Sequence, residues 1–308
     1  MVARVSFINA GPGRCATSWM FETLRTHPEI SMSNVKETEF FNSHHQKGYS
    51  WYEEHFSSSV TNVVGEISTN YYLDPAVPKR IRDYNREMKL IVNLRDPYAL
   101  MRSIYIFGLR RGLQLADLNE ELDQPMGKLM GSGYQARLLD DALTVSDQAT
   151  LLDAVRLMSR LKPFFDSFDS SQVYIFIYER LGSELEVVLS EIYDFLGVES
   201  DFRPEAADRI INASVVPKSP LAARLASRSS SLLRKFRFHG LLSFLHRSEL
   251  IKKAVFSSAV NVSKGLDTRA VVSARVRSIL DDEMEALLEY HPPLKKWWIP
   301  RSGSVSSN

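Results

Sequence analysis

The stretch Gly11-Pro12-Gly13-Arg14-Cys15-Ala16-Thr17-Ser18 follows the apolar run Val5–Ile8 and leads into residues 16–26, where large apolar side chains recur at helical spacing. This order predicts a buried strand, a tight turn and a helix. Glycines let the turn curl, and the N–H groups that begin a helix bind anions such as phosphate or sulfate. Arg14 adds a positive charge, and Thr17 and Ser18 add hydroxyl groups. The stretch therefore predicts an anion site, with a plain strand-to-helix turn as the alternative.

This loop is not a Walker A loop, which has the pattern G-x-x-x-x-G-K-[ST]. Five residues after Gly11 the chain has Ala16, and no Lys precedes Thr17. A magnesium-dependent nucleotide hydrolase is therefore disfavoured.

Other buried-strand candidates alternate with segments of helical period along the first two hundred residues. The strand candidates are Val60–Val64, Leu90–Leu94 and Val173–Ile177, and the helix candidates are Pro75–Tyr84, Tyr98–Arg111, Tyr134–Leu143, Leu151–Phe165 and Glu184–Leu196. Strands separated by helices pair in parallel through right-handed crossovers. We therefore expect an α/β fold in a single domain over residues 1–300, with a central parallel sheet of about five strands flanked by helices. A closing helix over Val271–Tyr290 predicts a helical C-terminal extension.

A second candidate anion site follows the strand candidate Leu90–Leu94. Arg95 stands at its carboxyl end, where open α/β sheets place their ligands, and Ser103 lies two turns into the next helix. An Arg and a Ser in these positions can hold one phosphate dianion together. The alternative is a structural ion pair between Arg95 and Asp96.

The two segments together resemble the sulfotransferases that use 3′-phosphoadenosine 5′-phosphosulfate (PAPS). The first is similar to the 5′-phosphosulfate loop of that P-loop-like family, and the second to its 3′-phosphate motif, an Arg followed eight residues later by a Ser. The resemblance is closest to the heparan sulfate N- and 3-O-sulfotransferase branch and its bacterial relatives. It covers roughly residues 4–200, and further segments that carry it are 36–42 (KETEFFN), 47–52 (KGYSWY), 65–68 (GEIS), 178–181 (YERL) and 195–197 (FLG).

The resemblance implies sulfuryl transfer from PAPS to a hydroxyl group, or less favourably an amine, of a saccharide or natural-product acceptor. It implies that Glu37 is the general base, which takes the proton of the attacking group. The alternative is a surface carboxylate, or one paired with the neighbouring Lys36. Arg14 and the N–H groups of residues 13–18 would stabilise the departing 5′-phosphate, and Arg95 and Ser103 would bind the 3′-phosphate. Such a reaction requires no metal.

Three departures from the family pattern keep other functions open. The family usually has Lys where this chain has Arg14 and Gly where it has Cys15 and Ala16, and the heparan enzymes commonly have Lys where it has Ile67. Arg keeps the charge of Lys but is no compact proton donor. A catalytically inactive nucleotide-binding protein on the same fold is therefore the second hypothesis. A small-molecule kinase is the third.

Several other residues have two interpretations each. Glu66 is either an alternative base or a hydrogen-bonded support of the pocket. His44, His45 and His55 lack a metal-ligand pattern such as H-E-x-x-H, although one of them is an alternative base. Cys15 is interpreted as a small buried residue rather than a nucleophile. Five aromatic residues fit either acceptor stacking or the core: Phe40, Phe41, Trp51, Tyr71 and Tyr72.

The stretch 217–264 has ten Lys and Arg residues against the single acidic residue Glu249. Its Leu and Phe residues predict a basic helical insertion. This insertion is a lid over the acceptor, a surface for a membrane or an acidic carrier, or amphipathic packing against the body with a solvated basic side. Lys264, in the pair Lys264-Gly265, is either a further contact to the 3′-phosphate or part of a solvated turn. The Ser-rich composition of residues 301–308 predicts a frayed tail.

The composition of the chain narrows the possible functions less than its motifs do. The 308 residues include 38 Lys and Arg against 37 Asp and Glu, so no bulk positive charge favours nucleic-acid binding. The single Cys excludes an internal disulfide, and no run of about 18 apolar residues predicts a membrane span. We therefore expect a cytoplasmic protein with a small-molecule or saccharide substrate.

Overall fold

The computed structural model describes residues 4–56, 63–110, 118–123, 149–204, 207, 215–217, 256–258 and 268–298. The helix expected over Tyr134–Leu143, the candidate ligand contact Lys264 and the tail 301–308 lie outside these ranges. Most of the basic stretch 217–264 lies outside them as well.

Five parallel strands form the central sheet. In sheet order they are β2 (Ile30–Met32), β3 (Val63–Ile67), β1 (Phe7–Asn9), β4 (Lys89–Leu94) and β5 (Val173–Ile177), and every neighbouring pair is parallel. The predicted α/β fold is thereby confirmed. β5 has its predicted bounds, and β1 begins at Phe7 rather than at Val5. β3 is described from Val63 to Ile67, so it extends beyond the predicted end at Val64, and the predicted start at Val60 lies outside the described residues.

The strand order creates a topological switch point at the carboxyl edge of the sheet. Phe7 of β1 pairs with Gly65 of β3 on one side and with Lys89 of β4 on the other. The chain leaves β1 into α1 (Thr17–Leu24) on one face of the sheet, and leaves β4 into α4 (Pro97–Arg110) on the other face. Open α/β sheets bind ligands where the connections that follow two neighbouring strands go to opposite faces of the sheet. Both candidate anion segments lie at this point.

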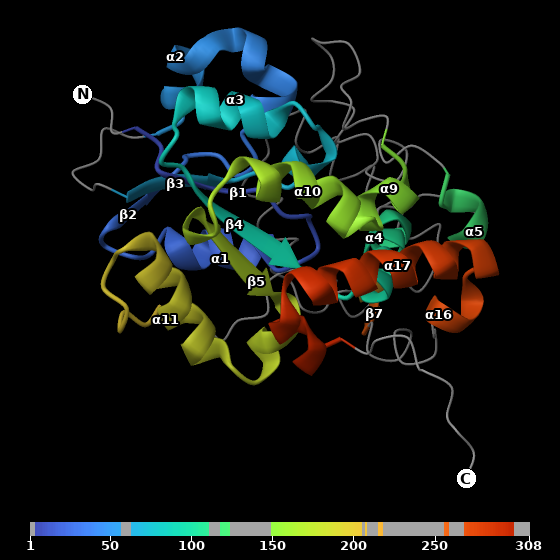
Figure 1. Ribbon diagram of the computed structural model, residues 1–308. Helices are drawn as coiled ribbons and strands as arrows, with labels where there is room; N and C mark the ends of the chain where they lie inside the picture. The colour runs from blue at the N-terminus through green and yellow to red at the C-terminus, as the bar shows by residue number, and fades with distance from the viewer. Residues whose placement is uncertain are drawn as a thin grey trace.

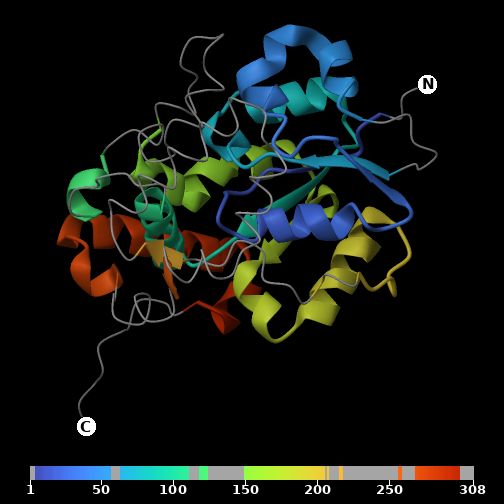
Figure 2. The same cartoon turned by 180° about the vertical axis from the view of Figure 1, so that it is seen from behind.

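Helices cover both faces of the sheet, as Figures 1 and 2 show from opposite sides. On one face α1 and α11 (Leu185–Leu196) pack against side chains such as Phe7 and Ile91. On the other face α3 (Val77–Tyr84), α4, α10 (Leu157–Ser167) and α17 (Ala274–Tyr290) enclose Ile8 and Leu90. Neighbouring strand residues thus enter opposite clusters, as the period of a strand requires.

Shorter elements complete the described fold. Between β2 and β3 the chain forms a π-helical turn (Phe40–His44), a 3-10 turn (His45–Lys47) and α2 (Gly48–Glu53). The other short helical elements are α5 (Leu118–Glu121), α9 (Leu151–Val155), α16 (Thr268–Val271) and the 3-10 turns Tyr71–Leu73, Ser170–Gln172, Tyr178–Gly182 and Pro292–Lys296. β6 (Val215–Pro217) and β7 (Phe256–Ser258), at the two ends of the basic stretch, pair in antiparallel fashion.

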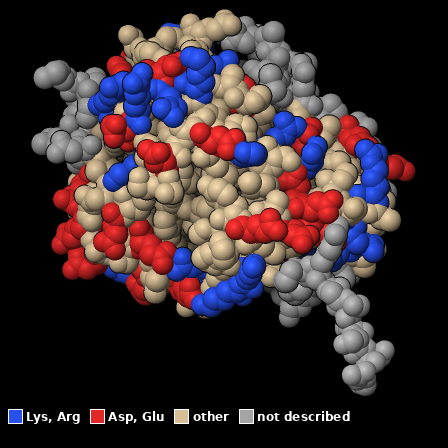
Figure 3. Space-filling model, viewed as in Figure 1, with Lys and Arg blue, Asp and Glu red and all other residues tan. Residues whose placement is uncertain are grey.

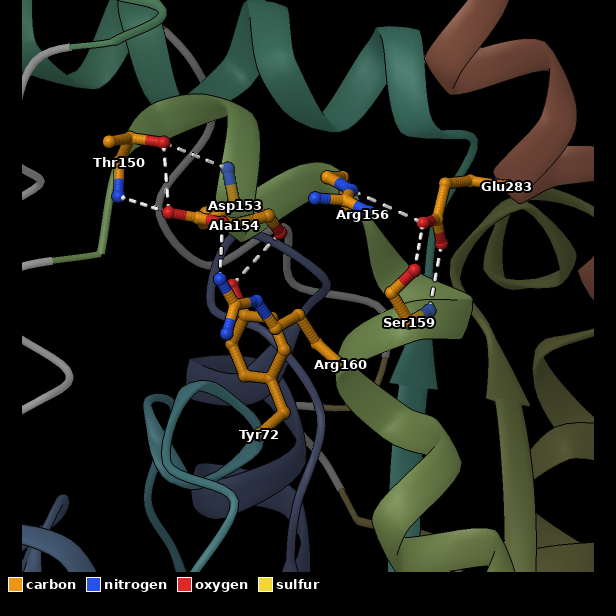
Figure 4. Close-up of polar contacts among 8 residues, drawn as sticks. All are labelled: Tyr72, Thr150, Asp153, Ala154, Arg156, Ser159, Arg160 and Glu283. Atoms are coloured by element: carbon orange, nitrogen blue, oxygen red, sulfur yellow. Dashed lines mark hydrogen bonds and ion pairs between the residues drawn. The ribbon is translucent and has the colours of Figure 1, made fainter.

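The single helix expected over Leu151–Phe165 is wrong, because Arg156 separates α9 from α10. α9 begins with a capping box, in which Thr150 and Asp153 satisfy each other's backbone N–H groups. α10 has no side-chain cap from Arg156; instead Glu283 of α17 accepts hydrogen bonds from the backbone N–H of Ser159, at 2.8 Å, and from its hydroxyl. Figure 4 shows this carboxylate reaching the start of α10 from the neighbouring helix.

The C-terminal extension is helical, as predicted, and it packs onto the body of the protein. The ring of Tyr290 at the end of α17 stacks on Phe165 of α10 with 4.2 Å between centroids. On the surface that Figure 3 shows, basic and acidic side chains are interspersed, and acidic ones gather at the lower left over α11. Among the described helices none has both the length and the apolar character needed to cross a membrane.

Candidate active site

The turn after β1 presses the chain against β4. A Cβ atom on Gly11 would lie 2.3 Å from the backbone nitrogen of Asn93, so this position requires glycine. Arg14 and Ala16 have φ angles of 65° and 62°, in the left-handed region that side chains other than glycine rarely adopt. Ala16 is the N-cap of α1, and no described side chain caps this end. The curled backbone therefore places the N–H groups at the N-terminus of α1 at the carboxyl edge of the sheet, as phosphate-binding turns do.

Two buried asparagines, Asn9 and Asn93, hold this turn through hydrogen bonds. The side-chain amide of Asn93 donates to the backbone carbonyl of Cys15 at 2.7 Å and accepts a hydrogen bond from the amide of Asn9. All three residues are fully buried. Burial raises the pKa of the Cys15 thiol to about 12, so the thiol stays protonated at neutral pH. Cys15 can therefore offer an anion its backbone N–H but no reactive thiolate.

The side chains predicted to bind phosphate come together beside this turn. Arg95 donates from Nη1 to the backbone carbonyl of Arg14 at 2.9 Å, and Arg14 donates from Nε to the hydroxyl of Ser103 at 3.2 Å. The Arg95 guanidinium lies over the ring of Tyr178, 4.2 Å from its centroid. Its Nε is buried and has no hydrogen-bond partner among the described atoms. A buried, unpaired N–H on a cation fits the oxygen of a bound anion.

The segment after β5 holds the Arg95 loop in place. Glu179 accepts the backbone N–H of Asp96 at 2.9 Å with one carboxyl oxygen, and the indole N–H of Trp298 at 3.1 Å with the other. Burial raises the pKa of both Glu179 and Asp96. In the sequence, the family resemblance alone points to the stretch 178–181. In the structure, Tyr178 packs against the guanidinium of Arg95, and Glu179 accepts the backbone N–H of Asp96.

Glu37 lies on the loop that connects β2 to the π-helical turn Phe40–His44. Its backbone N–H donates to the carbonyl of Ile67, the last residue of β3, at 3.0 Å. Its own φ is 64°, and its side chain, which is 27% exposed, forms an ion pair with Lys36. The predicted base therefore lies at the carboxyl edge of the sheet and has a cation beside it.

Glu66 is enclosed by hydroxyl groups. It is fully buried, and it accepts hydrogen bonds from Thr38 and Ser68 at 2.7 Å, from Tyr71 at 2.5 Å and from Tyr52 at 3.1 Å. Burial raises its pKa, although the four hydrogen bonds oppose this shift. These contacts favour the support role of Glu66 over the role of base, because the carboxylate is fully buried and four hydroxyl groups already donate to its two oxygens.

A second acidic residue on the same loop escaped the sequence analysis. Glu39 has a φ of 51°, is 9% exposed, and accepts hydrogen bonds from the amides of Asn42 at 2.6 Å and Asn70 at 3.2 Å. Asn70 follows Thr69, whose Cβ would lie 3.4 Å from a Cβ atom on Gly13. This amide–carboxylate cluster thus connects the Glu37 loop to the anion-binding turn. No pattern in the sequence joins Glu39 to Asn70, which follows 31 residues later in the chain.

The remaining predicted residues are placed as follows. Thr17, buried, and Ser18, half-buried, lie in the first turn of α1. Phe40, Phe41, Tyr71 and Tyr72 are core residues, whereas Trp51 is half-buried and packs with its ring against His44 and His55. No group of three or more His, Cys, Asp and Glu residues in the described part of the chain is arranged to hold a metal ion.

Comparison with known proteins identifies the family. Residues 6–219 of the 308 match the family described as sulfotransferase domain. Among solved structures, a sulfotransferase from Alicyclobacillus acidocaldarius is similar with a TM-score of 0.54 and 22% identity, over 80% of this chain and 98% of that one. At this identity the likeness supports the fold.

Three curated proteins show partial sequence similarity. The membrane-associated sulfotransferase kil1 of Dictyostelium discoideum is 32% identical over 34% of this chain and 23% of its own length. Heparan sulfate glucosamine 3-O-sulfotransferase 3B1 of Mus musculus is 25% identical over 61% of this chain and 45% of its own. Bifunctional heparan sulfate N-deacetylase/N-sulfotransferase 4 of Mus musculus is 31% identical over 62% of this chain and 22% of its own. The chain thus spans less than half the length of each. These matches confirm the resemblance seen in the sequence.

Proposed function

Because the chain belongs to the sulfotransferase family, we propose that it transfers a sulfuryl group from PAPS to a hydroxyl group and releases 3′-phosphoadenosine 5′-phosphate (PAP). The observation that carries the proposal is the cluster of Arg14, Arg95 and Ser103 beside the turn after β1. The buried Nε of Arg95, which has no described partner, is suited to a phosphate oxygen of the donor.

The two anionic ends of the donor have separate sites in this proposal. The backbone N–H groups of residues 13–18 and the positive charge of Arg14 bind the 5′-phosphosulfate. Arg95 and Ser103 bind the 3′-phosphate, which distinguishes PAPS from other adenylates. No step requires a metal.

The acceptor side of the reaction depends on Glu37. As the acceptor oxygen forms its bond to sulfur and the bond from sulfur to the 5′-phosphate oxygen breaks, Glu37 takes the acceptor proton. Arg14 and the loop N–H groups stabilise the negative charge that remains on the 5′-phosphate. Lys36 holds the Glu37 carboxylate in position through their ion pair.

A saccharide is the acceptor class that the named relatives support, since two of them carry heparan sulfate in their names. Ile67 stands where the heparan enzymes commonly have Lys, which leaves a natural-product scaffold as the alternative acceptor and an amine as a less favoured acceptor group. The cytoplasmic location, and a contact of residues 217–264 with a membrane surface or an acidic carrier, stay predictions.

Thermal unfolding with nucleotides tests the proposal. A ligand that binds only the folded state raises the melting temperature, and the rise grows with the ratio of the ligand concentration to its Kd. We expect PAP to raise it more than 5′-AMP, and ATP with Mg²⁺ to raise it least. No shift with PAP at high concentration would contradict the proposed function. A preference for ATP with Mg²⁺ would favour a kinase instead.

A further inference from the structure

The strand β5 lies at one edge of the sheet, because β4 is the only described strand that pairs with it. In the described part of the chain, the backbone of Tyr174, Ile175 and Phe176 forms no hydrogen bond with any segment other than β4. Successive residues of a strand turn their N–H and C=O groups to opposite sides, so part of this backbone faces away from the sheet. An edge of this kind is a template for a further strand.

The sequence of β5 has none of the residues that usually protect an edge. Proteins shield sheet edges with very short strands, charged side chains or prolines. The strand at the opposite edge, β2, has only three residues, whereas β5 has five, all of them β-branched or aromatic. Residues of these types favour pairing with another strand.

A groove with a volume of about 800 Å³ runs along this edge. Residues of β5 line it together with α11 on one side and, on the other, the end of α17 and the 3-10 turn Pro292–Lys296. Figure 1 shows β5 between α11 and the end of α17. Five extended residues, which span about 17 Å, would lie beside β5 over its whole length.

The side of the groove toward α17 is apolar. Val173 and Ile175 of β5 pack against the same apolar cluster as the buried side chains of α17. The rings of Tyr290, Pro293 and Trp297 line the groove on this side. Apolar side chains of an occupant would therefore be removed from water here.

The charged groups that line the groove satisfy one another. Arg180 donates to the two oxygens of Glu191 at 2.6 and 2.8 Å and to Glu184 at 2.8 Å, and Lys296 pairs with Glu184. His291 lines the groove as well, and burial, together with the charge of Arg180, lowers its pKa, so it adds no charge at neutral pH. Two cations and two carboxylates cancel, and the groove therefore complements an uncharged occupant.

We propose that this groove binds an extended, uncharged segment of a partner protein, which pairs with β5 as a sixth strand. The backbone of the segment supplies the hydrogen bonds that the edge lacks. Alternate side chains of a strand point to opposite faces of the sheet. Apolar side chains of the segment thus lie against Tyr290 and Trp297, and uncharged polar ones lie toward Arg180 and Glu191. The inference does not depend on the proposed function.

Synthetic peptides test the proposal. The probe is a fluorescently labelled peptide of seven alternating threonine and valine residues with blocked ends, and fluorescence anisotropy gives its affinity. Two further peptides have N-methyl groups on either all valines or all threonines, which removes the amide hydrogens along one edge of the strand. Since one edge alone faces β5, we expect one methylated peptide to bind about tenfold more weakly than the probe, or worse, and the other to bind nearly as well.

A substitution in the groove gives a second test. Val173→Lys places a charge on the half-buried edge of β5 and should weaken binding of the probe about tenfold or more. Val271→Lys makes the same change on the exposed surface of α16, outside the groove, and should leave binding unchanged. Melting curves check that both variants fold. The methylated peptides are measured on the wild type, so that test does not depend on the folding of a variant.

Three results would overturn the proposal. If the probe did not bind the wild type, the edge would not accept a strand of this chemistry. If both methylated peptides bound as well as the probe, the groove would capture apolar side chains without strand pairing. If the wild type were a dimer in size-exclusion chromatography and Val173→Lys a monomer, the edge would pair with a second copy of the chain instead.

Discussion

Two glutamates near the carboxyl edge of the sheet meet very different surroundings. Glu37 has a partly exposed side chain paired with Lys36, whereas Glu66 is fully buried among four hydroxyl donors. A general base needs access to the proton it removes, and Glu37 has that access. Glu66 instead orients Thr38, which lies between Glu37 and Glu39 in the chain. These surroundings agree with the proposed roles, in which Glu37 is the base and Glu66 supports the loop.

Replacing Glu37 by Gln removes the base with little change in shape. We expect the turnover number to fall by about 10²- to 10⁴-fold, the usual contribution of a general base, while PAP affinity is retained. Steady-state kinetics with PAPS and PAP titrations measure the two quantities. If PAP binding were lost along with turnover, Glu37 would have a structural role. If the wild type bound PAP without turnover on any acceptor, the inactive nucleotide-binding hypothesis would gain support.

The raised pKa of Glu66 predicts how its effect on stability depends on pH. Burial disfavours the ionised form in the folded state, so the folded pKa lies above the ordinary value of 4.5. The unfolded chain therefore loses this proton first, and the wild type loses stability as pH rises from that value through the folded pKa. Gln cannot ionise. We thus expect the melting temperature of the wild type, minus that of Glu66→Gln, to decrease as pH rises from about 4 to about 8.

Melting curves of the two proteins in the same buffers give this difference directly, and Glu285→Gln, an exposed change on α17, serves as the control. The control should show no comparable trend. A difference that increased with pH would mean that the four hydroxyl donors outweigh the cost of burial, and that Glu66 is held as an anion.

The sequence predicts residues for the proposed donor site, but it does not predict the partners that hold them. Arg14, Arg95 and Ser103 were recognisable because each follows a strand at a short, fixed spacing. The hydroxyl cage of Glu66 was not, since Thr38, Tyr52 and Tyr71 come from separate turns. Such partners are chosen by tertiary packing, which leaves no periodic trace in the chain.

At the scale of elements, the loop after β1 can contact β4 only because Gly11 has no side chain. Gly11→Ala would place a Cβ atom 2.3 Å from a backbone atom of Asn93, which a rotamer change cannot relieve. We expect the variant to lose about 1–3 kcal/mol of unfolding free energy or more, and to bind PAP weakly. Urea unfolding measures the first quantity. Gly182→Ala, where a Cβ would meet nothing within 4 Å, should be nearly neutral. Equal effects in the two variants would refute the close approach.

The break between α9 and α10 predicts a role for a distant carboxylate. Glu283→Ala would leave the N–H of Ser159 at the start of α10 without its acceptor. We expect a loss of about 1–3 kcal/mol of unfolding free energy, as for other buried caps. Glu283→Gln keeps an acceptor oxygen and should recover most of this loss. Glu285→Ala, on the exposed side of the same helix, is the control. A neutral Glu283→Ala would show that water replaces the carboxylate.

Strands and helices with strong local patterns were predicted well, and elements defined by distant contacts were not. β5 is a run of five β-branched and aromatic residues and was found at its observed bounds, Val173–Ile177. β2 has three residues, too few to show a period. The break at Arg156 depends on Glu283, more than a hundred residues later, so the apolar period of residues 151–165 suggested one continuous helix.

At the scale of the whole molecule, the proposed donor site is assembled from segments that span nearly the full described chain. The turn after β1 and the loop after β4 carry the proposed phosphate contacts. Glu179, after β5, accepts a hydrogen bond from the loop after β4 and another from Trp298. Trp298 is 2% exposed and ends the described C-terminal segment. The C-terminal extension is thus coupled to the Arg95 loop through one half-buried carboxylate.

This coupling predicts that Trp298→Phe weakens both the fold and donor binding. Phe keeps an aromatic ring but loses the N–H that Glu179 accepts at 3.1 Å, which leaves one oxygen of a half-buried carboxylate without this donor. We expect a loss of about 1–3 kcal/mol in urea unfolding. Because the same carboxylate holds the Asp96 backbone beside Arg95, PAP affinity should also fall several-fold in calorimetric titration. Trp297→Phe, which changes the neighbouring half-buried ring, should spare PAP affinity. If Trp298→Phe were destabilised yet bound PAP like the wild type, the extension would support the fold without shaping the donor site, and the Arg95 loop would be held by β4 and α4 alone.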